Sequence, residues 1–211
     1  MRGRMKQKRS NRLWLVAITL LAFCIPGLLH AGQPTDEIQA TVEKAMAVLR
    51  NPALKAEDRR HERRDQIRQA LLPRFDFSEM AKRSLGAHWR RRTPEQQREF
   101  TEAFTDLLER AYIERIEAYD DEKFVYTRER QDKEYAEVDG RILTKKGEEF
   151  SINYRLHLTD QGWKVYDLVI ENISLVNNYR DQFNRVITKS SYEDLIRRLK
   201  EKSISSTDGR N

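Results

Sequence analysis

The sequence predicts an α+β domain in which helices pack on a four-stranded antiparallel sheet. Apolar residues recur every three or four positions up to residue 119, every second position between 124 and 170, and at helical spacing again from 175 onward. Helices and strands that occupy separate parts of a chain are typical of this class. The segments between the strands are too short for parallel crossovers, so the sheet is predicted to be antiparallel.

The first half of the chain predicts helices separated by strong stop signals. Thr35 is a suitable N-cap for the first helix, which ends before Pro52. A highly charged second helix is predicted over 55–72. A short third helix over 77–85 is followed by Gly86, at the position where helix ends favour glycine.

The fourth helix has the sharpest local signal in the chain. Thr93 is its predicted N-cap, Pro94 takes the first helical position, and Gln96 completes a capping box. The helix is predicted to continue to Tyr119. Its apolar stripe consists of Phe100, Phe104, Leu107, Leu108, Ala111 and Tyr112.

Four strands follow, joined by short turns. The first is predicted to begin at Phe124, and the other three are predicted over 135–143, 150–158 and 163–170. In the strand 163–170 both alternating sets of residues are largely apolar. This pattern fits a sheet covered by helices on both sides, and it also fits a sheet curled around an internal cavity. The pattern alone favours the first interpretation.

Two amphipathic helices, over 175–187 and 192–199, close the domain. The polar residues 203–211 are predicted to form a frayed tail. We therefore expect one domain over 32–202, without internal repeats or linkers.

Residues 1–31 are predicted to be a cleavable signal peptide. Six basic residues and no acidic residue precede an apolar run from Leu13 to Ile25. The small residues Ala31 and Gly32 follow the run. The run is shorter than the roughly 20 residues of a membrane span, so an uncleaved anchor is the weaker alternative. Lipidation at Cys24 is also disfavoured, because bulky Phe23 precedes it. The signal indicates export.

Without these residues the chain is formally neutral, with 34 Lys and Arg beside 34 Asp and Glu. The sequence pI of about 9.4 therefore reflects mostly the signal peptide, and it gives no reason to expect nucleic-acid binding. No cysteine remains either, which excludes disulfides and thiolate metal sites.

Two long stretches together resemble one known family. The first runs from Phe75-Asp76-Phe77 through Leu85-Gly86 and Trp89 to the helix opened by Thr93-Pro94-Glu95-Gln96. The second joins 163–168 to 173–180 and Phe183. They look like the MlaC or toluene-tolerance family of periplasmic phospholipid carriers. Asn172 departs from the pattern, because the family more often has glycine there.

The resemblance implies a fold and a function. It implies helices and a curled four-stranded sheet of the NTF2-like or cystatin-like kind, enclosing an apolar lipid cavity. The expected protein is a periplasmic monomer without cofactor that carries phospholipid between the outer and inner membranes and maintains lipid asymmetry. The expected partners are an inner-membrane ABC transporter complex with an MCE-domain protein and an outer-membrane lipoprotein and porin complex.

Eight apolar or aromatic residues are candidates for contact with lipid. Ordinary core packing explains most such positions one by one, but some are expected to line the pocket, with tyrosines suited to its mouth. The candidates are Leu108, Tyr112, Tyr154, Tyr166, Val169, Ile173, Leu175 and Tyr179.

Other chemistry is weakly indicated. Arg90-Arg91-Arg92 reads as a solvated loop, with contact to a headgroup or an acidic partner as the alternative. The histidines show no metal-binding spacing. A small enzyme that uses Asp167 as a base is a rival hypothesis, and a lipid-free adaptor or chaperone of the envelope is another.

Overall fold

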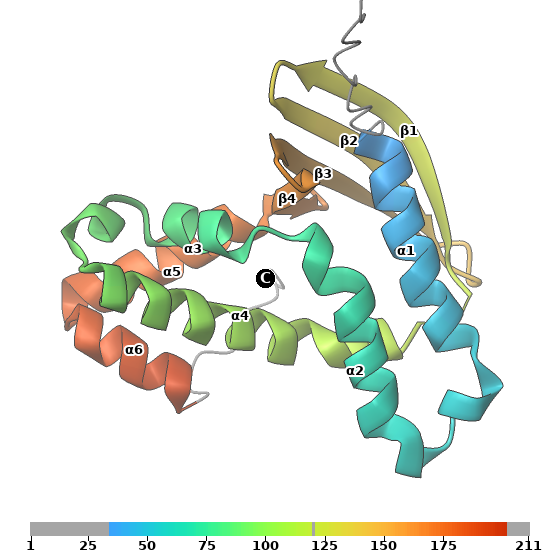
Figure 1. Ribbon diagram of the computed structural model, residues 1–211, viewed down its shortest axis with the longest axis horizontal. Helices are drawn as coiled ribbons and strands as arrows, with labels where there is room; N and C mark the ends of the chain where they lie inside the picture. The colour runs from blue at the N-terminus through green and yellow to red at the C-terminus, as the bar shows by residue number, and fades with distance from the viewer. Residues whose placement is uncertain (1–33, 120, 202–211) are drawn as a thin grey trace, which may run out of the picture. The chain divides into compact units, whose positions relative to one another are not determined.

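Helices and strands follow in the predicted α+β order (Figure 1). The computed structural model describes residues 34–119 and 121–201, which belong to the second of two compact units, Ala31–Asn211. The predicted signal peptide, over 1–31, and the predicted tail, over 203–211, lie outside the described residues. Within the described ranges, no helix combines the length and apolar character that a membrane crossing needs.

The described residues form six α-helices and four 3₁₀ helices. The α-helices are α1 (Pro34–Arg50), α2 (Arg60–Leu71), α3 (Phe77–Leu85), α4 (Pro94–Glu117), α5 (Leu175–Lys189) and α6 (Tyr192–Lys200). The 3₁₀ helices are η1 (Pro52–Leu54), η2 (Glu57–Arg59), η3 (Leu72–Arg74) and η4 (Gly86–Arg91). The predicted helix over 55–72 is therefore shorter than expected, because η1 and η2 occupy the chain before Arg60.

Two of the three predicted helix caps are found in the structure. The capping box of α4 is confirmed, since Thr93 Oγ1 accepts from the backbone N of Gln96 at 3.3 Å and Gln96 Oε1 accepts from the backbone N of Thr93 at 3.1 Å. Gly86 ends α3 at a φ of 57°, as predicted. The N-cap at Thr35 is wrong, because α1 already begins at Pro34. Instead, the backbone N of Thr35 donates to Glu129 of the sheet at 2.8 Å.

Over the described ranges the sheet has five antiparallel strands, where the sequence predicted four. Their order is β1 (Lys123–Asp132), β2 (Tyr135–Leu143), β3 (Glu149–Thr159), β4 (Gly162–Ile170) and β5 (Ile173–Ser174). Strand β5 has only two residues, so it has no alternation that the sequence could reveal. It follows a tight turn at Glu171 and Asn172, whose φ angles of 48° and 64° are left-handed. Asparagine tolerates this conformation better than most residues, and it stands here in place of the glycine that the resemblance led us to expect.

A bulge in β4 corrects the prediction of two apolar faces. Leu156 of β3 pairs with Val165 of β4, and Tyr154 pairs with Leu168. One residue of β3 therefore separates these pairs, whereas two residues of β4, Tyr166 and Asp167, separate them. The extra residue brings Val165 and Leu168 to the same face of the sheet. The apolar residues Trp163, Val165, Leu168 and Ile170 therefore all belong to one face, which α1 covers with Ile38 and Val42 (Figure 1).

The described residues form three core clusters. The sheet cluster joins the inner face of β2, β3 and β4 to α1 and includes Tyr154, Trp163 and Val165. The bundle cluster joins α3, α4, α5 and α6 around Phe104, Tyr179 and Phe183. The small three-helix cluster joins Leu49 of α1, Ile67 of α2 and Ile113 of α4. Most domains have one contiguous core, so the space between the three clusters is of interest.

A buried carboxylate connects the sheet to the bundle. The side chain of Asp167 in β4 is 4% exposed. It accepts from the backbone N of Val176 at 3.0 Å, from Ser174 Oγ at 2.7 Å and from Arg155 Nη1 at 3.2 Å. Three donors around one buried carboxylate fix the start of α5 against β4.

Candidate functional site

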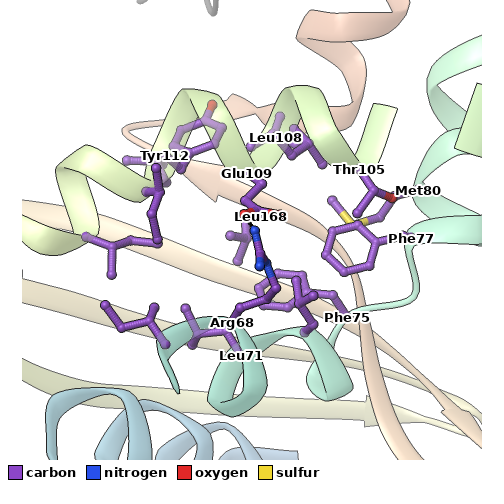
Figure 2. Close-up of a pocket in the computed structure, with 16 residues that line it drawn as sticks. Arg68, Leu71, Phe75, Phe77, Met80, Thr105, Leu108, Glu109, Tyr112 and Leu168 are labelled. Atoms are coloured by element: carbon purple, nitrogen blue, oxygen red, sulfur yellow. Dashed lines mark hydrogen bonds and ion pairs between the residues drawn. The ribbon is translucent and has the colours of Figure 1, made fainter. Parts of the chain in front are cut away.

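An apolar pocket of about 240 Å³ lies between α2, α3, α4 and the end of β4 (Figure 2). All three core clusters contribute to its lining. Met80, Leu108 and Leu175 line it from the bundle cluster, Ile67 and Ile113 from the three-helix cluster, and Leu168 and Ile170 from the edge of the sheet cluster. The remaining lining residues are Arg68, Leu71, Leu72, Phe75, Phe77, Thr105, Glu109, Tyr112 and Ile116.

The lining is almost entirely hydrocarbon. Thr105 uses its hydroxyl within α4, where it donates to the carbonyl of Thr101 at 2.8 Å. Arg68 and Glu109 are the charged lining residues, and they form an ion pair with each other across the pocket (Figure 2). A pocket of this composition suits an apolar ligand.

Helix α2 forms one wall and is attached to α4 by ion pairs beyond the pocket. Glu117 near the end of α4 has a side chain that is only 8% exposed. Arg63 donates to one of its carboxylate oxygens at 3.0 Å and Arg64 to the other at 2.7 Å. Partial burial alone raises the pKa of Glu117, but the hydrogen bonds from Arg64 and Arg63 outweigh it and lower the pKa below its usual value.

We predict that Glu117→Gln lowers the free energy of unfolding by about 2 kcal/mol. The change leaves two half-buried guanidinium groups without their carboxylate, and the partial exposure of Arg64 reduces the cost below that of a fully buried pair. Because the folded state lowers the pKa of Glu117, its contribution is complete above the unfolded pKa of about 4.3 and is lost as the pH falls through the folded pKa. Urea unfolding at pH 7 and at pH 3 measures both effects.

The control for this prediction is Glu99→Gln, also on α4. Glu99 pairs with Lys200 at 2.5 Å, and both side chains are exposed, so its loss should change stability by less than about 0.5 kcal/mol. Equal stabilities of the two variants would show that Glu117 does not hold α2 in place.

The structure brings three of the eight candidate residues to this pocket: Leu108, Tyr112 and Leu175. Two others are buried in cores, Tyr154 in the sheet cluster and Tyr179 in the bundle cluster, where burial raises the pKa of both hydroxyls. The last three lie elsewhere, with Tyr166 under the guanidinium of Arg83, Val169 opposite Asn153 on the outer face, and Ile173 exposed in β5. For all eight candidates, contact with lipid stays a prediction.

Most of the pocket wall was not among the candidates. Ile67 and Leu71 belong to a helix that reads as charged, and Phe75 and Phe77 flank a helix start. The signal that could have found them was weak, since in α2 only Ile67 is buried. Simple alternation along 163–170 places Leu168 and Ile170 on the face opposite Trp163, and only the bulge in β4 brings them to the same face.

The described residues show no grouping of side chains that could hold a metal ion. Each described histidine has its own partner: His61 contacts Asp65, His88 contacts Asn184, and His157 contacts Asp76. Asp167 does not line the apolar pocket, and its oxygens already accept three hydrogen bonds.

The arginine run lies away from the pocket. Arg90 and Arg91 are exposed in η4, and Arg92 places its guanidinium 4.4 Å from the ring centre of Tyr192. The expectation of a solvated segment fits the first two residues. Arg92 is better described as packing on α6.

Comparison with known proteins gives a consistent result. Residues 39–201 match the family model described as MlaC protein. The chain is 22% identical over 140 residues to the intermembrane phospholipid transport system binding protein MlaC of Haemophilus influenzae, covering 64% of this chain and 65% of that protein. It is 24% identical over 169 residues to the toluene tolerance protein ttg2D of Pseudomonas putida, covering 79% of each. The match thus spans slightly less than two thirds of the H. influenzae protein.

A solved structure resembles the fold. It is the phospholipid-binding protein from Ralstonia solanacearum in complex with a phospholipid, with a TM-score of 0.71 and 27% sequence identity. The likeness covers 81% of this chain and 96% of that one.

Proposed function

This chain belongs to the MlaC family, and on that premise we propose that it is a periplasmic carrier that holds phospholipid acyl chains in the pocket between α2, α3 and α4. The observation that carries the proposal is the pocket itself, whose lining is hydrocarbon apart from Arg68, Thr105, Glu109 and the hydroxyl of Tyr112. The complex of the R. solanacearum protein with a phospholipid supports the same ligand class.

The free energy of transfer explains why a carrier needs such a pocket. Two acyl chains expose roughly 30 methylenes, which cost on the order of 24 kcal/mol in water at about 0.8 kcal/mol each. No lipid crosses an aqueous gap at a useful rate with that surface exposed. An apolar pocket removes most of the cost, and its affinity has to be close to that of a bilayer for loading and release to be reversible.

The pocket has to widen to admit two chains. Pockets for drug-sized ligands have volumes of about 300–1,000 Å³, and this one has about 240 Å³. The wall formed by α2 is the part best suited to move, because its ties to α4 are long arginine side chains and a small apolar cluster. Separation of α2 from α4 would extend the pocket without disturbing the bundle cluster.

The proposal includes a route and partners. The carrier would move phospholipid between an outer-membrane lipoprotein and porin complex and an inner-membrane ABC transporter complex with an MCE-domain protein, and so maintain lipid asymmetry. The predicted signal peptide supports a periplasmic location. Contact with a partner would trigger release, since water alone does not extract an acyl chain.

Mass spectrometry of lipids extracted from the purified protein tests the binding step. We expect two-tailed phospholipid at about one molecule per chain, the ratio that one pocket allows. Protein that is folded but free of lipid, and that takes up none from vesicles, would contradict the proposal and favour the adaptor hypothesis. Bound lipid that is chemically altered during incubation would favour the enzyme hypothesis.

A further inference from the structure

The ion pair of Arg68 and Glu109 lies where the apolar pocket meets water. Both side chains line the pocket, and they are 42% and 24% exposed, whereas Leu108 and Leu175 of the same lining are buried. Figure 2 shows the two side chains reaching toward each other from α2 and α4. A lipid with its tails in the pocket would have its headgroup beside this pair.

The surroundings of Arg68 contain more negative than positive charge. Its Nη1 donates to Asp65 at 2.9 Å, while Nη2 donates to Glu109. The hydrogen bond that Arg68 donates to Glu109, together with the charges of Glu109, Asp65 and Asp106, raises the pKa of Arg68. Three carboxylates thus act on one guanidinium. On α4, Arg110 donates to the carbonyl of Leu199 at 3.1 Å, and Arg115 lies 5.8 Å from the ring centre of Tyr112 and has interactions of its own.

One donor of Arg68 is unused. Its Nε is buried and has no hydrogen-bond partner among the described residues. A buried N–H without an acceptor costs free energy, and a phosphate oxygen is an acceptor that a guanidinium binds well. Arg68 can therefore donate from Nε to a phosphate oxygen while it keeps its contact with Asp65.

We propose that Arg68 and Glu109 form a headgroup site that selects zwitterionic phospholipids: Arg68 binds the phosphate, and Glu109 binds a cationic amine such as that of phosphoethanolamine. This inference rests on the proposed function and goes further by naming the headgroup class. Glu109 now accepts from Nη2 of Arg68, the donor that a phosphate bound to Nε would also use. When the phosphate displaces it, the freed carboxylate becomes a partner for the ammonium group.

The same arrangement disfavours anionic headgroups. A phosphoglycerol lipid also has a phosphate for Arg68, but it has no cation to offset Glu109, Asp65 and Asp106. Like charges at short range discriminate between partners more than they change overall binding. We expect a preference of about fivefold for phosphoethanolamine over phosphoglycerol lipids with the same acyl chains, which decreases in high salt because the pair is partly exposed.

The experiment is a competition between headgroups. Delipidated protein is incubated with vesicles of equal parts phosphatidylethanolamine and phosphatidylglycerol with identical chains, and native mass spectrometry gives the ratio of the two bound lipids. Glu109→Gln should reduce the preference to near unity. Asp65→Asn, which leaves the pocket lining intact, should reduce it partly. Glu99→Gln, on the same helix but paired with Lys200, should leave it unchanged.

The possible outcomes separate this inference from the proposed function. Equal ratios for the wild type, Glu109→Gln and Asp65→Asn, with lipid bound in all of them, would overturn the headgroup site and leave the carrier function standing. Absence of lipid from every protein, including the wild type, would contradict the carrier function. A preference of the wild type for phosphatidylglycerol would reverse the proposed roles of the charges and overturn the inference.

Discussion

Thr105→Trp is expected to remove most of the phospholipid bound by this protein while the fold remains stable. Thr105 lines the pocket from α4 and is half-buried, so an indole at this position projects into a volume of about 240 Å³. Displacement of even three methylenes of an acyl chain costs about 2.4 kcal/mol, roughly fiftyfold in affinity. Threonine and tryptophan have similar helix propensities, so α4 itself should tolerate the change. Lipid extracted per mole of protein is the measurement.

The chain offers a closely matched control for this experiment. Thr101 lies one turn earlier on α4, is also half-buried, and also donates its hydroxyl to the carbonyl four residues before, at 2.8 Å. It does not line the apolar pocket. Thr101→Trp should therefore bind the wild-type amount of lipid. If Thr105→Trp retains full lipid with an unchanged melting temperature, the acyl chains lie somewhere other than this pocket.

Asp167→Asn is expected to lower the free energy of unfolding by about 3 kcal/mol, or roughly 6–12 °C in melting temperature. The substitution keeps the shape of the side chain but removes its charge, and its amide N–H₂ replaces one of the accepting oxygens. At least one of the donors on Arg155, Ser174 and Val176 then loses its acceptor in a site where the Asp167 side chain is 4% exposed. Thermal unfolding followed by circular dichroism measures the loss.

Asp139→Asn is the comparison for Asp167→Asn, because Asp139 lies on the same outer face of the sheet with a side chain that is 31% exposed. It should lose less than about 1 kcal/mol. Lipid binding by Asp167→Asn below its melting temperature should equal that of the wild type, because Asp167 does not line the pocket. Loss of a lipid-modifying activity in this variant, with its stability intact, would instead support the enzyme hypothesis.

Local signals predicted most elements correctly. The capping box at Thr93, the glycine after α3 and the alternation in β3 depend on neighbouring residues, so a single sequence contains the information. The errors arose where tertiary contacts decide. Helix α1 starts at Pro34 and places Thr35 against Glu129, far away in the chain. Strand β5 forms because a left-handed turn at Asn172 brings two residues back to β4.

The candidate site shows the same division. Leu108, Tyr112 and Leu175 reach the pocket because each belongs to an apolar stripe that faces the interior. Tyr154 and Tyr179 belong to equally apolar stripes but meet other side chains. Periodicity indicates which face of an element is buried. It does not indicate whether that face meets a neighbour or a cavity.

The sequence by itself determined the α+β class, the order of the helices and strands, and a resemblance to the family to which the chain belongs. The tertiary structure decided how many strands the sheet has, which face Leu168 and Ile170 take, and where the apolar pocket lies. The physical reason is the range of the interactions. Hydrogen bonds and side-chain alternation within an element act over a few residues, whereas a bulge, a two-residue strand and a space between three clusters depend on contacts between residues that are distant in the chain.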